Sequence, residues 1–124
     1  MKLVLYDDFS PGLLRKDAVV DISGAVAHLQ GRSPQQLMEG IIDNFEALYS
    51  RLEHLAISGH AVPLSSVRLR APLPRPSKML CCIGNYWEHA ERDPRPINMF
   101  LKSPEAVIGP GDTVMLPDFP ASVF

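Results

Sequence analysis

One histidine and one lysine in the second half of the chain are the residues best suited to chemistry. His89 titrates near neutral pH, so it could exchange protons with a substrate if a neighbouring group fixed its tautomer. Lys102 follows an apolar run and could hold a substrate carboxylate. A structural histidine and a solvated lysine at a strand end are the alternatives, and the residues by themselves leave both open.

Two short apolar runs must position these residues. Residues 79–83 predict a buried strand and residues 98–101 a second strand, with the polar turn that carries His89 between them. A rigid pair of strands can present ionisable groups at its ends. Cys81 and Cys82 are expected to pack in the core. Adjacent strand residues point to opposite faces, and the spacing of these cysteines from His89 fits no usual zinc pattern.

The first half of the chain predicts a small β-rich module with one amphipathic helix. Residues 2–6 form an expected strand that ends at turn-forming residues 7–8 and 10–12, and residues 13–22 form an expected hairpin with a charged tip. Ser33, Pro34 and Gln36 are typical of a capped helix start, and Gly59 of a helix end. Apolar residues between them recur every three or four positions, as on one helix face. A coiled-coil helix is disfavoured, because the pattern covers fewer than four heptads.

A proline-rich connector over residues 60–77 divides the chain. We expect residues 1–65 to form a small N-terminal accessory domain and residues 66–124 to open a second domain. The Gly-Pro-Gly-Asp sequence at 109–112 predicts a tight turn, because no Rossmann-like strand-to-helix pattern surrounds it. The predicted fold class is α+β.

The composition excludes several classes of protein. The chain has 124 residues, 46% of them hydrophobic, which is typical of a globular protein. Its formal net charge of −2 provides no basic field, so a nucleic-acid partner is not expected. No apolar stretch approaches the roughly 18 residues that span a bilayer, so we expect no membrane partner. The adjacent cysteines and the absence of a signal-peptide pattern predict a reduced, cytoplasmic protein.

Residues 67–117 resemble the start of the catalytic domain of the fumarylacetoacetate hydrolase family. The resemblance rests on five motifs in order: a proline-rich lead-in, a Lys-apolar-Leu-Cys strand, an Asn-Tyr-x-x-His turn, a Phe-x-Lys strand and an Ile-Gly-Pro-Gly-Asp turn. Residues 1–65 are similar to the small N-terminal domain that many members carry. The resemblance implies a β-rich, roll-like catalytic domain and a homodimer.

The resemblance also implies an activity. Members of the family bind Mg²⁺ or Mn²⁺ and act on acylpyruvates and related oxo-acids by C–C hydrolysis, decarboxylation or keto–enol isomerisation. Carried over to this chain, His89 is the catalytic general base, while Asn85, Tyr86 and Lys102 bind substrate. Some members pair this histidine with a glutamate three residues later, where this chain has Arg92. Whether a neighbouring carboxylate assists His89 stays open, the candidates being Glu91 and Asp93.

The family's metal-binding carboxylates, a Glu-x-Glu pair and a later acidic residue, would follow Phe124. We therefore expect the 124-residue chain to hold no cation by itself and to be inactive alone, as the N-terminal part of a longer enzyme. The alternative is a free-standing small β-rich binding or dimerisation module without catalysis.

Overall fold

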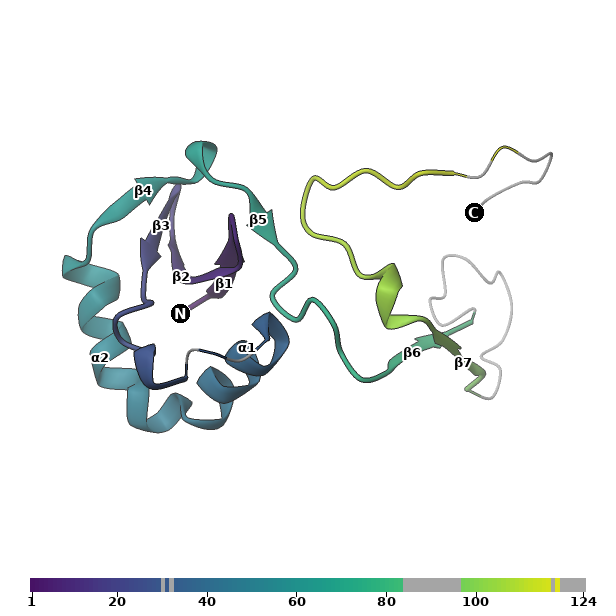
Figure 1. Cartoon of the computed structure of the whole chain (residues 1–124), viewed down its shortest axis with the longest axis horizontal. Helices are drawn as coiled ribbons and strands as arrows, with labels where there is room; N and C mark the ends of the chain where they lie inside the picture. Colours follow the sequence, from purple (N-terminus) through teal and green to yellow (C-terminus); the bar gives the residue numbers. More distant parts are fainter. Residues whose placement is uncertain (30, 32, 84–96, 117, 119–124) are drawn as a thin grey trace.

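The structure is a computed structural model that describes residues 1–124 except 30, 32, 84–96, 117 and 119–124 (Figure 1). Its described part contains a five-stranded sheet, two α-helices and a separate two-stranded ribbon. The predicted α+β class is therefore confirmed. Among the described residues, no helix has both the length and the apolar character needed to cross a bilayer.

The larger sheet is antiparallel throughout, in the order β4-β3-β2-β1-β5. Its strands are β1 (Leu3–Tyr6), β2 (Ser10–Arg15), β3 (Ala18–Asp21), β4 (Ala61–Pro63) and β5 (Leu69–Arg70). The predicted hairpin with a charged tip is confirmed, because Arg15 pairs with Ala18 across the β2–β3 turn. Since β5 pairs with β1, the sheet extends past residue 65. The proposed division into 1–65 and 66–124 stays a prediction.

The turn predicted at residues 10–12 is wrong, because these residues begin strand β2 and Tyr6 pairs with Ser10. The turn predicted at residues 7–8 is confirmed: the chain reverses over residues 7–9, where Asp7 and Phe9 have positive φ angles of 46° and 62°. A distant segment holds this conformation: the Asp7 amide donates to the Arg68 carbonyl at 2.8 Å, and the Arg68 amide donates to the Asp7 carboxylate at 2.8 Å. At residues 10–12, by contrast, local turn propensity gave way to pairing with β1.

The predicted helix start is confirmed, with a complete capping box between Ser33 and Gln36. Where the sequence predicted one helix, the structure has two: α1 (Pro34–Asp43) and α2 (Phe45–Ser58). They are divided at Asn44, whose side-chain amide donates to the Gly40 carbonyl at 2.8 Å. Such a side-chain bond competes with regular helical hydrogen bonding. The Asn44 backbone accordingly has non-helical angles, φ −104° and ψ 15°.

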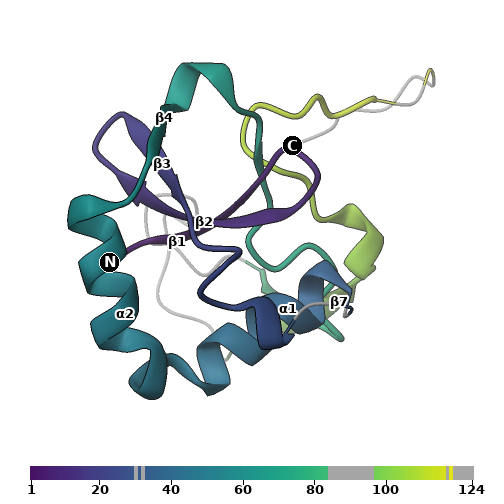
Figure 2. The ribbon, with the colours of Figure 1, turned by 60° about the vertical axis from the view of Figure 1, so that its left-hand side comes forward.

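The core lies between the helices and one face of the larger sheet, and Figures 1 and 2 show both helices together on one side of it. The sheet contributes Leu13 and Val20, and the helices contribute Ile41 and Leu52, all at most 1% exposed. Three short 3-10 helices complete the described elements: η1 (Ala27–Leu29), η2 (Leu64–Ser66) and η4 (Pro104–Ala106).

The smaller sheet is an antiparallel ribbon of β6 (Met79–Cys82) and β7 (Met99–Lys102), as the two apolar runs predicted. Figure 1 shows this ribbon apart from the larger sheet. The expectation that the first run is buried is wrong, since Leu80 is 63% exposed and every residue of β7 is exposed. Apolar composition produced strands here, but burial also requires a second layer to cover them.

Gly59 caps α2 where the helix end approaches β3. Its φ of −67° suits any residue, so space rather than conformation requires glycine here. A Cβ at this position would lie 2.5 Å from the Leu55 carbonyl oxygen and 2.5 Å from Cγ1 of Val20.

We predict that Gly59→Ala lowers the free energy of unfolding by about 1–3 kcal/mol, because it forces a methyl group into a packed junction. Gly24→Ala is the matched control: its Cβ would meet nothing within 4 Å, so we expect a change within about 0.5 kcal/mol. Urea unfolding of both variants measures the difference. Equal midpoints for the two would show that the junction accommodates the methyl group.

Candidate active-site ribbon

Of the four predicted site residues, the structure describes one. Asn85, Tyr86 and His89 fall within 84–96, outside the described residues. Lys102 is the last residue of β7 and is exposed. Its Nζ lies 5.8 Å from the centroid of the Phe100 ring, on the same face of the strand.

The ribbon register decides where Lys102 lies relative to the segment that contains His89. Cys82 pairs with Met99, and the Ile83 amide donates to the Asn98 carbonyl at 2.9 Å. Ile83 and Asn98 therefore lie together at one end of the ribbon. Lys102 pairs with Met79 at the other end, three residues away, which is about 10 Å at the usual rise of a strand. The predicted position of Lys102 at a strand end is confirmed, whereas His89 lies outside the described residues.

The two cysteines do not occupy a core. Cys81 is half-buried, Cys82 is exposed, and both are free thiols. The expected core packing is therefore wrong for Cys82, for the same reason as for the strand as a whole. Within the part of the chain that the structure describes, no three His, Cys, Asp or Glu side chains gather closely enough to hold a metal ion. The described residues thus do not fit a metal centre.

The predicted tight turn at 109–112 is confirmed, and it contacts the larger sheet. The Asp112 amide donates to the Gly109 carbonyl at 3.2 Å, and Gly111 has a φ of 79°. The Asp112 carboxylate accepts from the Gly109 amide at 2.8 Å and forms an ion pair with Arg68. The hydrogen bond from Arg68, followed by that from the Gly109 amide, lowers the pKa of Asp112 below its ordinary value.

A second attachment joins the segment after β7 to helix α1. Glu105 in η4 forms an ion pair with Arg75, and the Arg75 amide donates to the Gln35 side chain at 3.0 Å. Sequence reasoning missed both ion pairs. Their partners are 44 and 30 residues apart, and no local pattern announces such a contact.

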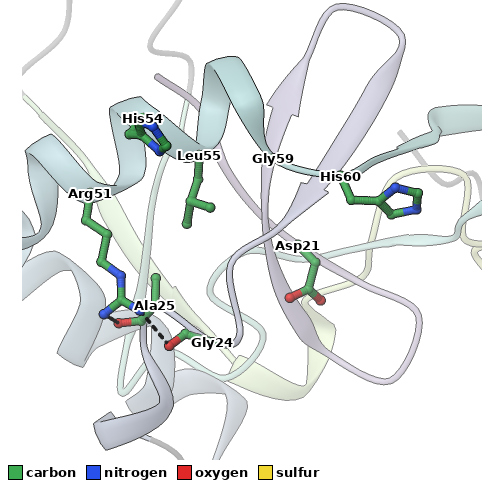
Figure 3. A pocket seen from close by; sticks show the side chains of 8 residues that line it. All are labelled: Asp21, Gly24, Ala25, Arg51, His54, Leu55, Gly59 and His60. Carbon is green, nitrogen blue, oxygen red and sulfur yellow. Dashed lines mark hydrogen bonds between the residues drawn. The ribbon is translucent and has the colours of Figure 1, made fainter.

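A hollow of about 490 Å³ on the N-terminal half offers ionisable groups but not a converging site (Figure 3). Arg51 donates to the carbonyls of Gly24 and Ala25 at 3.2 and 3.4 Å. Figure 3 shows the rings of His54 and His60 projecting in different directions. Arg51 thus holds the loop after β3 against α2, and the three side chains do not surround a common point.

Asp21, also in this hollow, is already fully engaged. Its carboxylate accepts from the Tyr6 hydroxyl at 2.7 Å, and from the amide and hydroxyl of Ser23 at 2.8 and 3.2 Å. Burial, followed by the hydrogen bond to this carboxylate, raises the pKa of Tyr6 to about 12. Asp21 therefore fixes structure and is not free for catalysis.

Comparison with known proteins gives a consistent result. No model of a protein family matches the chain. It is 50% identical over 58 residues to oxaloacetate tautomerase YisK of Bacillus subtilis, covering 41% of this chain and 19% of that protein. It is 31% identical over 101 residues to fumarylacetoacetate hydrolase domain-containing protein 2 of Pongo abelii, covering 76% of this chain and 32% of that protein.

A solved structure matches nearly the whole chain. The crystal structure of maleylpyruvate hydrolase from Sphingobium sp. SYK-6, in complex with manganese(II) and pyruvate, aligns with a TM-score of 0.81 and 30% identity over 97% of this chain. The chain belongs to the fumarylacetoacetate hydrolase family. It spans less than half the length of the relatives named here, since it covers 44% of the maleylpyruvate hydrolase chain. The family resemblance found in the motifs is thereby confirmed.

The engagement of Asp21 can be tested by alkaline titration. Tyr6 should lose its proton near pH 10 in the unfolded chain and only near pH 12 in the folded protein. The contribution of the protonated Tyr6 to the free energy of unfolding is therefore fully present below pH 10. We predict that the free energy of unfolding falls as the pH rises from about 10 to 12. Tyr6→Phe should remove this part of the pH dependence, and Tyr49→Phe should retain it. A Tyr6 phenol that titrates near 10 would show that Asp21 does not hold it.

Proposed function

We propose that this chain is the N-terminal part of a divalent-metal-dependent enzyme that acts on acylpyruvate-like or related oxo-acids. The observation that carries the proposal is the match of nearly the whole chain to a maleylpyruvate hydrolase that was crystallised with manganese(II) and pyruvate. The sequence match to an oxaloacetate tautomerase supports the same substrate class. Maleylpyruvate and oxaloacetate are both 2-oxo-acids that can enolise, so C–C hydrolysis, decarboxylation and keto–enol isomerisation all remain within the proposal.

Within this proposal, each predicted site residue has a distinct role. His89 is the general base that takes a proton from substrate or water, and Asn85 and Tyr86 line the substrate site. Lys102 binds a substrate carboxylate. Its exposed position at the end of β7 supports this role, because the amine is accessible and the strand fixes its backbone.

The proposed cation is Mg²⁺ or Mn²⁺, which would polarise the enolisable oxygens of the substrate. The described residues supply no ligand cluster for it, so the proposal assigns its ligands to none of them. We further propose residues 1–65 as an accessory domain, residues 66–124 as the opening of the catalytic domain, and a cytoplasmic homodimer as the working form.

A second candidate function is a binding or dimerisation module without catalysis. The exposed apolar residues of the ribbon favour it, since Leu80 is 63% and Leu101 68% exposed. Apolar side chains gathered on a strand pair are typical of a surface that another chain or domain covers. The mass of the protein in its source cell discriminates: a mass near the 13.7 kDa of this chain favours the module, and a larger mass favours the enzyme.

Steady-state kinetics with acylpyruvates and oxaloacetate test the enzyme, using the protein as its source cell makes it. We predict that His89→Gln lowers kcat by about 10²- to 10⁴-fold with little change in KM, because only proton transfer is lost. Lys102→Ala should chiefly raise KM, and Lys78→Ala, at the neighbouring end of β6, is the matched control with normal kinetics. A near-normal kcat in His89→Gln would remove this histidine from the mechanism.

We also predict that the 124-residue chain alone shows no stoichiometric binding of Mn²⁺ or Mg²⁺ at micromolar concentrations. Hard cations need several oxygen ligands at one point, and the described residues offer no such cluster. Titration calorimetry of the chain measures this. In the protein from its source cell, a chelator should abolish turnover and added Mn²⁺ should restore it. Tight binding by the 124 residues would contradict the assignment of the ligands to other residues.

A further inference from the structure

The segment that follows Lys102 is fastened to earlier parts of the chain at two points. We call residues 103–112 the strap. Its first attachment is the ion pair of Glu105 with Arg75, and its second is the turn at 109–112, which lies against β5. Because the strap continues β7 directly, its attachments restrict where the end of the strand that carries Lys102 can lie.

The two attachments differ in burial. In the first ion pair both side chains are largely exposed, at 74% for Arg75 and 69% for Glu105, so water screens the attraction. In the second, Arg68 is 59% exposed but Asp112 only 21%. Backbone contact strengthens the second attachment: a Cβ on Gly109 would lie 3.1 Å from the Arg70 Cα and 3.1 Å from the Leu69 carbonyl oxygen.

Asp112 joins the turn to the sheet because its two carboxylate oxygens have different partners. Oδ2 accepts from the Gly109 amide and closes the turn, while Oδ1 accepts from Arg68. The Arg68 backbone is itself held by Asp7, through the two hydrogen bonds of 2.8 Å described above. Arg70 strengthens this corner, since its Nε donates to the Asp7 carbonyl at 2.6 Å and its guanidinium lies over the Phe9 ring.

We infer that Asp112 is a positioning residue for Lys102: through Arg68 it fastens the strap to the N-terminal sheet, which thereby fixes the end of β7. The inference rests on the proposed function in one respect, namely that Lys102 binds the substrate carboxylate. It gives the five-stranded sheet a part in placing Lys102, because the strap is held from β5 and, through Arg68, from the β1–β2 turn.

The test compares Asp112→Asn with Glu105→Gln in the protein as its source cell makes it. Each variant removes one negative charge from the strap and keeps a side chain of nearly the same shape. Hydrogen exchange followed by mass spectrometry reports the amides of Gly109 and Asp112, and the strands of residues 3–21 serve as the internal reference. Steady-state kinetics on a 2-oxo-acid report kcat and KM separately.

We expect Asp112→Asn to speed exchange in the strap about fivefold or more, the scale set by loss of a partly exposed ion pair, while residues 3–21 are unchanged. KM should rise by a similar factor and kcat should stay near normal, because substrate binding is affected and proton transfer is not. Glu105→Gln should change both measurements much less. Arg68→Gln should reproduce the effect of Asp112→Asn, and Arg68→Lys, which keeps the charge, should largely restore both readouts.

Unchanged strap exchange in Asp112→Asn would overturn the attachment. Faster exchange with an unchanged KM would overturn the positioning of Lys102. A protein without turnover of any 2-oxo-acid before substitution would instead overturn the proposed function and with it the role of Lys102, and the exchange measurement alone would then decide the attachment.

Discussion

Burial of one helical stripe against one face of an antiparallel sheet is the constraint on which the described fold depends. Ile41 and Leu52 from the helices meet Leu13 and Val20 from the strands, and all four are at most 1% exposed. Apolar burial is worth about 25 cal/mol per Å², and no other described cluster buries so many large side chains. The remaining features, including the strap and the β1–β2 turn, are arranged at the edges of this core and depend on its rigidity.

Elements with local signals were predictable from the sequence. The capping box at Ser33, the hairpin around Arg15 and the strands of the ribbon each follow from residues within a few positions of one another. The α+β class follows from the same signals. The pairing of β5 with β1 was not predictable, because it joins distant segments and depends on the fold as a whole.

The errors have physical reasons of two kinds. At residues 10–12, pairing with β1 outweighed the local turn propensity. At Asn44, a hydrogen bond from the side-chain amide to the preceding turn interrupted the helix. In the ribbon, the strands were predicted correctly but their burial was not, because burial depends on whether another layer of the fold packs on the strands. For the site, the sequence predicted the strand that carries Lys102 but not the ion pairs that fasten the strap. Attraction between charges 44 residues apart depends on tertiary structure alone.

The register of the ribbon fixes the position of Lys102 independently of the segment between β6 and β7. Met79 pairs with Lys102 and Cys82 with Met99, so the ladder itself places the lysine. The hydrogen bond from the Ile83 amide to the Asn98 carbonyl closes this end of the ribbon. Residues could therefore be inserted or removed between Ile83 and Asn98 without moving Lys102 relative to β6. With the proposed role of Lys102, a protein with this arrangement can exchange the segment between the strands while the proposed contact to the substrate carboxylate stays in place. Divergence of substrate choice would then be expected to concentrate in that interval.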